Sequence, residues 1–156
     1  MEIDLRPMLP ADAPAVAALI RAAFAAQAVA TDPPPSALRE TAGSVAATLA
    51  QGGGAVAMAA GAAVGAVLWQ PRDGGLYMGR LAVAPGWRGR GVARALVAAA
   101  EAAARAQGQP RLHLSTRLVL ADNRRLFAAC GFREAALHAH PGYAAPTYVD
   151  MEKSLT

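Results

Sequence analysis

The chain has 156 residues, of which 54% are hydrophobic, with a net formal charge of +4 and a single cysteine. This length suits one domain, residues 1–156, large enough to bury roughly 70% of its unfolded surface. A lone cysteine excludes an internal disulfide, and the lack of an uncharged apolar run of about 18 residues argues against a membrane-spanning helix. The opening MEIDLRPMLP has acids where a signal peptide has basic residues, so we expect a cytoplasmic protein with no membrane partner.

The first third of the chain predicts a short strand and two helices. Residues 3–5 have the pattern of a strand, and Asp12 followed by Pro14 is typical of a helix start. Three consecutive prolines at 33–35 cannot continue that helix. Ser36 is then expected to cap a second helix, which ends at the glycines 52–54.

The middle of the chain predicts an antiparallel meander. Strand-like apolar runs occupy residues 55–60, 63–70 and 76–83. Gly61 separates the first two runs, PRDGG at 71–75 separates the second from the third, and both are turn sequences. Runs joined by such short turns are expected to pair with one another in sequence order.

The second half predicts helices that alternate with strands. An alanine-rich helix follows Gly91 and ends near Gly108, with Pro110 beyond it as a stop signal. The remaining elements are a strand at 111–116, a helix at 122–130 capped by Gly131, and strands at 133–139 and 147–153. The order β-α-α-β-β-β-α-β-α-β-β, without repeats or long linkers, indicates one α+β domain.

The stretch LAVAPGWRGRGVARALVAAAEAAARAQG, residues 81–108, carries the first functional signal. Glycines at 86, 89 and 91 and arginines at 88, 90 and 94 stand directly before the long helix. From Ala84 to Arg133 nine arginines face two acids, a net charge of +7, whereas the rest of the chain has six basic and nine acidic residues, a net charge of −3. A strand, a glycine-rich turn and a helix N-terminus together bind anions, because the first-turn N–H groups lack helical partners. The stretch therefore predicts a pyrophosphate site.

Two common phosphate-binding motifs and a nucleic-acid partner find no support. The P-loop pattern G-x-x-x-x-G-K-[ST] is absent, and Arg94 breaks the dinucleotide pattern G-x-G-x-x-G. The chain has no aromatic platform and no recognised nucleic-acid motif, so we expect no nucleic-acid partner. The alternative without a ligand is a solvated basic turn before an exposed helix.

Further patterns resemble those of a known family. RGRGVA at 88–93 fits R/Q-x-x-G-x-G/A, the acyl-CoA pyrophosphate loop of the GCN5-related N-acetyltransferase (GNAT) family, and LAVAP at 81–85 resembles the end of its fourth strand. STRLVLADNRRLFAACGF at 115–132 is similar to its second signature, T-x-x-L-x-x-x-N-x-x-L-Y-x-x-x-G-F, and residues 148–155 to its closing strand. The resemblance implies a mixed central sheet with splayed fourth and fifth strands. It also implies an enzyme that moves the acetyl group of acetyl-CoA to an amine.

The resemblance further implies how acetyl-CoA is held. The backbone near Leu81 and Val83 faces the pantetheine arm, and N–H groups from Arg88 to Arg94 hold the pyrophosphate, with the side chain of Arg88 or Arg90 reaching the 3′-phosphate. Asn123 bonds the pantetheine near its thiol end. The implied cofactor-binding set is Leu81, Ala82, Val83, Arg88, Gly89, Arg90, Gly91, Val92, Ala93, Arg94, Asn123 and Phe127.

The general base is not identified by the sequence. Members of the family often supply a carboxylate from the fourth strand, but residues 76–83 contain none, and Tyr77 is the one ordinary candidate there. Glu40 is a second candidate, and either faces the acceptor cleft or lies on a solvated helix face. A base matters because a lysine-like amine with a pKa of about 10.4 costs roughly 4–5 kcal/mol to deprotonate at pH 7.

The general acid departs from the family pattern. Phe127 stands where the family usually has the tyrosine that protonates the departing thiolate, and phenylalanine has no proton to donate. Ser115 and Tyr143 are the hydroxyl groups that could substitute. The departure keeps a second hypothesis open, namely a catalytically weak acyl-CoA-binding or regulatory domain.

The remaining candidates have simpler interpretations. His138, His140 and Tyr143 in HAHPGY lie where the family's last two strands border the acceptor cleft, and a lone H-x-H without a third ligand predicts no metal site. Cys130 is interpreted as a packing residue, and His113 as the opposite face of its strand. The acceptor amine is not identified, and a homodimer stays open because the family often dimerises.

Overall fold

The computed structural model describes residues 2–156 and has the predicted order of strands and helices. Three short 3-10 turns add to it, at Pro10–Asp12, Ser36–Arg39 and Pro85–Trp87. The strands are β1 (Asp4–Pro7), β2 (Gly53–Ala59), β3 (Ala62–Arg72), β4 (Gly75–Val83), β5 (Arg111–Arg117), β6 (Arg133–His138) and β7 (Tyr148–Ser154). The helices are α1 (Ala13–Ala25), α2 (Ala42–Gln51), α3 (Val92–Ala106) and α4 (Ala121–Ala129). The α+β prediction is thus confirmed.

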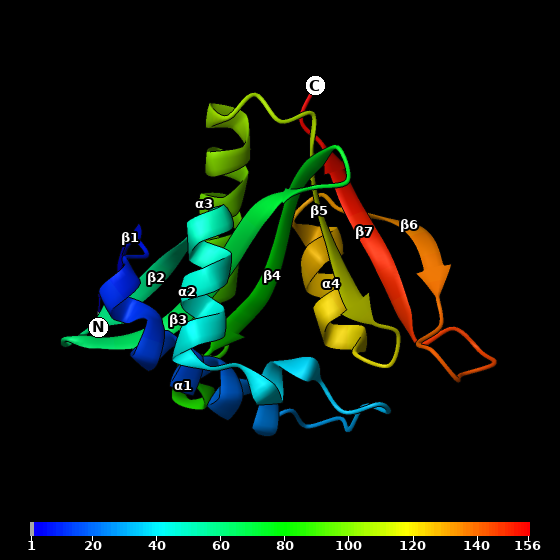
Figure 1. The fold of residues 1–156 in the computed structure, drawn as a ribbon, viewed down its shortest axis with the longest axis horizontal. Helices are drawn as coiled ribbons and strands as arrows, with labels where there is room; N and C mark the ends of the chain where they lie inside the picture. The colour runs from blue at the N-terminus through cyan, green and yellow to red at the C-terminus, as the bar shows by residue number, and fades with distance from the viewer. Residues whose placement is uncertain (1) are drawn as a thin grey trace.

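All seven strands form one mixed sheet in the order β1-β2-β3-β4-β5-β7-β6. The predicted meander β2-β3-β4 is antiparallel throughout, and β4 with β5 is the one parallel pair among the described residues. That pair is short, because only Leu76 with Leu112 and Tyr77 with His113 are in register. Beyond these residues β4 and β5 diverge towards their carboxyl ends (Figure 1), which confirms the expected splay.

Helices cover both faces of the sheet and build two hydrophobic clusters. α3 and α4 cover one face, where Leu96, Leu112 and Phe127 are buried together. α1 and α2 cover the opposite face of the meander, where Ile20, Val45 and Leu68 are buried. Figure 1 shows α2 and α3 on opposite sides of β3 and β4. The sheet therefore lies between the two layers of helices.

The second helix begins five residues later than Ser36 predicts. The prolines before it keep the chain extended, Ser36–Arg39 forms only a 3-10 turn, and Glu40 returns to extended backbone with ψ 138°. Thr41 is the real N-cap, because its side chain accepts a hydrogen bond from the Ser44 N–H and the Ser44 hydroxyl completes a capping box. Glu40 is consequently not on a helix.

A bulge interrupts β4 where it leaves β5. Leu68 of β3 pairs with Gly79 and Ala66 pairs with Ala82, so Arg80 and Leu81 together oppose a single residue of β3. Arg80 takes the left-handed conformation with φ +56°, which is rare for a residue with a side chain. A bulge bends its strand and redirects side chains, so it adds to the divergence of β4 from β5.

Candidate active site

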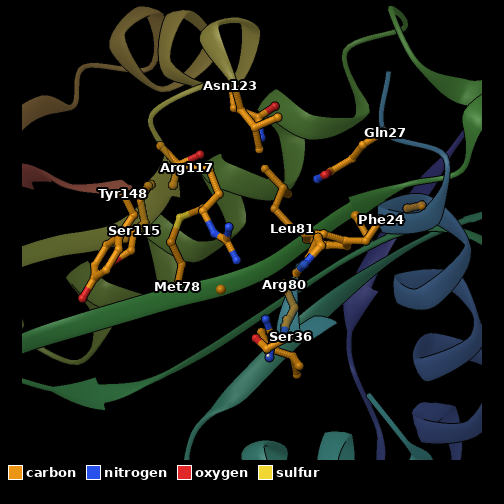
Figure 2. Close-up of a pocket in the computed structure, with 18 of the residues that line it drawn as sticks. Phe24, Gln27, Ser36, Met78, Arg80, Leu81, Ser115, Arg117, Asn123 and Tyr148 are labelled. Carbon is orange, nitrogen blue, oxygen red and sulfur yellow. Dashed lines mark hydrogen bonds between the residues drawn. The ribbon is translucent and has the colours of Figure 1, made fainter. Parts of the chain in front are cut away.

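The diverging strands open into a cavity of about 1140 Å³. It is bounded by the carboxyl halves of β4 and β5, by α4, by the end of α1 with the chain that follows it, and by the loop between β6 and β7. Figure 2 shows side chains from β4, β5, α4, the end of α1 with the chain that follows it, and the start of β7 around one space. Leu112 and Leu114 of β5 belong to the hydrophobic cluster under α3 and α4, and residues 114–117 of the same strand line the cavity.

The cavity has two sides that differ in composition. The α4 side is lined by Leu81, Ala82, Val83, Arg88, Ala93, Asn123 and Phe127, all of which the sequence predicts. The α2 side is lined by Ser36, Arg39, Glu40, Arg72, Tyr77, Arg80, Ser115, Arg117, His140 and Tyr148. The first side is mainly apolar and also carries Arg88, Asp122 and the Asn123 amide, and the second is polar and rich in arginine.

The glycine-arginine loop adjoins the α4 side at the N-terminus of α3. Gly89 and Gly91 take left-handed conformations with φ +75° and +81°, and Gly91 is the N-cap of α3. The Ala95 N–H donates to the Gly91 carbonyl, so the N–H groups of the first turn, residues 92–94, precede the helical ladder and have no helical acceptor. Left-handed residues before a helix turn successive N–H groups toward one point, which makes an anion-binding nest.

The arginine side chains of this loop have other partners. The guanidinium of Arg88 donates to the carbonyl of Ala23 at 3.0 Å and of Ala26 at 3.5 Å, both at the end of α1. The guanidinium of Arg90 lies 4.9 Å from the ring centre of Trp87. Arg88 therefore joins the loop to α1, and Trp87 stacks on Arg90 while packing against the core. The predicted anion site would therefore rest mainly on backbone N–H groups.

Phe127 is a buried member of the hydrophobic cluster under α3 and α4. Its ring is 5% exposed and meets the Phe132 ring edge-on at 6.0 Å between centres. Cys130 packs against the same cluster, as expected of a packing residue, and its carbonyl accepts from the Lys153 ammonium at 3.0 Å. The position is thus an apolar wall of the cavity.

Glu40 is buried, not solvated. It is 7% exposed, and its carboxylate accepts from the Arg80 guanidinium at 2.8 Å and from the Ser44 hydroxyl at 2.5 Å. Arg80 also donates to the Ser36 hydroxyl at 3.0 Å. The interpretation as a solvated helix face is therefore wrong, because Glu40 follows a 3-10 turn in extended backbone and pairs with Arg80 of β4. Its carboxylate is an ion-pair partner of the bulge residue.

Tyr77 and His113 form a packed pair beside the start of the splay. Their rings meet edge-on at 5.3 Å, and the guanidinium of Arg72 lies 4.5 Å above the Tyr77 ring. Nε2 of His113 donates a hydrogen bond to the Arg72 carbonyl at 2.8 Å. Burial lowers the pKa of His113, with a smaller opposing effect from that hydrogen bond. His113 is therefore a neutral structural residue.

A chain of three polar side chains connects the cavity to solvent, and sequence reasoning missed its centre. The Ser115 hydroxyl on β5 donates to Asp150 Oδ1 at 2.7 Å, and Asp150 Oδ2 lies 2.7 Å from Nε2 of His138 on β6. Asp150 is on β7, directly opposite Ser115 in the ladder. The sequence pattern alone could not find it, because the register between β5 and β7 pairs residues 35 positions apart.

Among the described residues that line the cavity, His140 and Tyr148 are present but Tyr143 is not. The Tyr143 hydroxyl donates to Asp32 Oδ1 at 2.6 Å, and this bond raises the pKa of Tyr143. It connects the β6–β7 loop to the chain after α1. Tyr148 lies deeper, stacked on His138 at 5.1 Å and edge-on to His140 at 4.9 Å. Burial, with a smaller effect from Arg117, lowers the pKa of His140.

Arg117 is the half-buried cation of the cavity. Its guanidinium donates to the carbonyls of Pro33 at 2.6 Å and Pro34 at 3.3 Å, and burial lowers its pKa. Asp32 and Tyr143 act on it from a distance, in the opposite direction. In the sequence, Arg117 is distinguished only as one of the nine arginines between Ala84 and Arg133.

A splayed parallel strand pair, a glycine-rich loop before a helix and an adjoining cavity define a protein that binds a long, phosphate-bearing molecule between two strands. The comparisons with known proteins agree with this class. The family model described as "Acetyltransferase (GNAT) family" matches residues 16–132. The chain belongs to this family of acetyltransferases, and acetyl-CoA is the cosubstrate.

Solved structures with the same fold have low sequence identity. The ribosomal-protein-S18-alanine N-acetyltransferase from Escherichia coli is similar at a TM-score of 0.77 and 18% identity, with 99% of this chain and 95% of that chain covered. Nourseothricin acetyltransferase gives 0.75 and 24%, with 100% of both chains covered. The protein yncA of Salmonella typhimurium, solved with its cofactor acetyl-CoA, gives 0.75 and 19%, with 100% and 95% covered. No curated protein matches the chain significantly.

Within residues 2–156 no helix is long and apolar enough to cross a membrane. In the same range no group of three or more His, Cys, Asp or Glu side chains is arranged to hold a metal ion.

Proposed function

We propose that the protein transfers the acetyl group of acetyl-CoA to an amine by direct attack, with both substrates bound together. The observation that carries this proposal is the splay of β4 from β5, which opens one cavity to both the Gly91 helix end and the arginine-rich α2 side. Acetyl-CoA would lie on the α4 side and the amine would approach from the α2 side. The acetyl carbonyl would then lie between the two sides of one cavity.

The cofactor contacts follow from the free backbone groups. After Tyr77 the β4 backbone has no β5 partner in register, so the groups near Leu81 and Val83 are available to the amides of the pantetheine arm. The first-turn N–H groups of α3 would receive the pyrophosphate. Asn123 lines the same side and would bind the pantetheine near its thiol end.

In the reaction, the amine nitrogen attacks the acetyl carbon, a C–N bond forms, the C–S bond breaks and the thiolate leaves. The nitrogen must also lose a proton. Ser115 is the cavity-lining member of the chain that includes Asp150 and His138, so its oxygen would accept that proton while passing its own to Asp150. This route would provide the base that β4 does not supply, whereas the Glu40 carboxylate is held by Arg80 and Ser44.

The thiolate leaves without a tyrosine to protonate it. If the coenzyme thiol has a pKa of about 8.5, like free cysteine, protonation at pH 7 gains about 2 kcal/mol. Water would then supply the proton, and turnover would be slower than with an acid at position 127. The alternative, a catalytically weak acyl-CoA-binding or regulatory domain, is favoured by Phe127 and by the absence of a carboxylate on β4.

Thiol release from acetyl-CoA at pH 8 across a panel of amines tests the proposal. Acceptor-dependent release supports the enzyme, and acetyl-CoA that raises the melting temperature without any release supports the binding domain. For the base, Ser115→Ala should lower kcat about 10- to 100-fold and leave the Kd of acetyl-CoA unchanged. Ser154→Ala, an exposed serine on β7, is the matched control. An unchanged kcat in Ser115→Ala would remove Ser115 from the mechanism.

A further inference from the structure

The α2 side of the cavity carries more positive charge than its acids balance. Arg39, Arg72, Arg80 and Arg117 line it together with Glu40, whereas Asp122, the other acidic residue among the described lining residues, lies on α4. Cavities lined by one sign of charge concentrate ligands of the opposite sign. An acceptor amine with several positive charges would therefore be repelled, whereas one with an anionic group would be attracted.

The four arginines differ in how far their charge is already compensated. Arg80 is paired with the Glu40 carboxylate at 2.8 Å. Arg72 lies over the Tyr77 ring and has Asp73 at 3.7 Å. Arg39 is exposed at the end of its 3-10 turn.

Arg117 is both desolvated and free of an ion pair. Its guanidinium touches only the carbonyls of Pro33 and Pro34, and within residues 2–156 no carboxylate oxygen lies within 4.0 Å of it. A guanidinium has five N–H donors, so these bonds leave several unused. Figure 2 shows its side chain extending into the cavity beside Ser115 and across from Arg80. Asp32 acts on this guanidinium only from beyond ion-pair distance, so a ligand that supplies a closer counter-charge would be favourable for the half-buried cation.

We propose that Arg117 binds a carboxylate of the acceptor, so that the acceptor is a small amino acid. This inference rests on the proposed function, because it concerns the second substrate of that reaction. A planar guanidinium binds a carboxylate through two parallel hydrogen bonds, and this geometry is stronger and more selective than a single contact.

The spacing along β5 fits such a substrate. Ser115 and Arg117 are two residues apart and share one face of the strand, which separates their backbones by roughly 6.6 Å. A short amino acid would have its carboxylate at Arg117 and its amine near Ser115, where the proposed proton route begins. Tyr148 of β7, which pairs with Arg117 of β5, would cover the carbon chain between the carboxylate and the amine of the substrate.

Matched acceptors that differ only in the carboxylate test the inference. Thiol release is measured with glycine, β-alanine and 4-aminobutyrate, each against its amide and against an N-terminal dipeptide of the same residue. We expect at least one free amino acid to have a kcat/KM at least tenfold above that of its amide. Arg117→Gln should reduce this ratio to about one by lowering the kcat/KM of the free amino acid, while the Kd of acetyl-CoA is kept. Arg133→Gln, an exposed arginine on β6, should leave the ratio unchanged.

Each other result has a definite meaning. Amides acetylated as well as the amino acids, or a preference that survives in Arg117→Gln, would overturn the inference and leave the proposed function standing. A dipeptide preferred over the free amino acid would overturn the small-molecule assignment.

A binding measurement covers the cases in which the variant fails to fold or nothing is acetylated. Butyrate, but not butyramide, should raise the melting temperature of the wild-type protein saturated with coenzyme A, and equal effects would refute the inference. The absence of any shift with acetyl-CoA itself would instead refute the proposed function.

Discussion

Gly91 offers a test of the anion site in which strain and ligand contact can be separated. It is the N-cap of α3 with φ +81°, and a Cβ built on it meets nothing within 4 Å. A side chain at this position is therefore opposed by backbone conformation alone. Gly61, in the turn between β2 and β3, has φ +80° and equally open surroundings, so it provides the same strain away from the cavity.

The expected magnitudes follow from that match. Left-handed backbone costs a residue with a Cβ roughly 1–2 kcal/mol, so Gly91→Ala and Gly61→Ala should lower the free energy of unfolding by similar amounts. In Gly91→Ala, relief of the strain also turns the N–H groups of the first turn away from their common point. Loss of one charge-assisted hydrogen bond, worth roughly 1.5–3 kcal/mol, would weaken acetyl-CoA binding about 10- to 150-fold.

Two assays decide the outcome. Urea unfolding gives the stability of each variant, and calorimetric titration gives the Kd of acetyl-CoA. We expect equal stability losses, with the Kd raised only in Gly91→Ala and further in Gly91→Val. If Gly91→Val bound acetyl-CoA as tightly as Gly61→Ala, the assignment of the pyrophosphate to this loop would be refuted.

Three further predictions concern packing, pH and turnover. Gly65→Ala would bring its Cβ to 2.7 Å from Val92 Cγ1, so it should destabilise the protein by about 1–3 kcal/mol and weaken acetyl-CoA binding by moving the start of α3, as urea unfolding and titration would reveal. Burial lowers the pKa of His113 in the folded state below its unfolded value of about 6.5, so the folded protein binds fewer protons at this residue than the unfolded chain. The contribution of neutral His113 to the free energy of unfolding is therefore present above pH 6.5 and is lost as the pH falls through the folded pKa. Urea unfolding at pH 7.5 and 5.5 should show a smaller acid loss in His113→Gln, and an equal loss would contradict the argument. Phe127→Tyr should raise kcat about tenfold by supplying an acid, and an unchanged kcat in the thiol-release assay would mean that water already suffices.

The order of elements and the anion loop could be predicted from the sequence because their signals are local. A proline run, a glycine at a left-handed position and an apolar alternation each act on a few neighbouring residues, so the meander, the Gly91 start of α3 and the Gly131 cap agree with the structure. The N-cap of α2 was misplaced at Ser36 because two caps, Ser36 and Thr41, compete within six residues. The local pattern does not show which of them is followed by a continuous helix.

Contacts between distant strands and loops were decided only by the tertiary structure. Asp150 meets Ser115 because of the register of β5 against β7, and Glu40 meets Arg80 because the chain after α1 folds back over a bulge. Arg117 acquires its carbonyl partners from a loop more than 80 residues earlier in the chain. A sequence signal for such a contact would have to encode the relative position of two elements, and that position results from the packing of the whole sheet. The residue types and the glycine-rich loop before α3 could thus be predicted from the sequence, whereas the surroundings of Glu40, Ser115 and Arg117 came from packing alone.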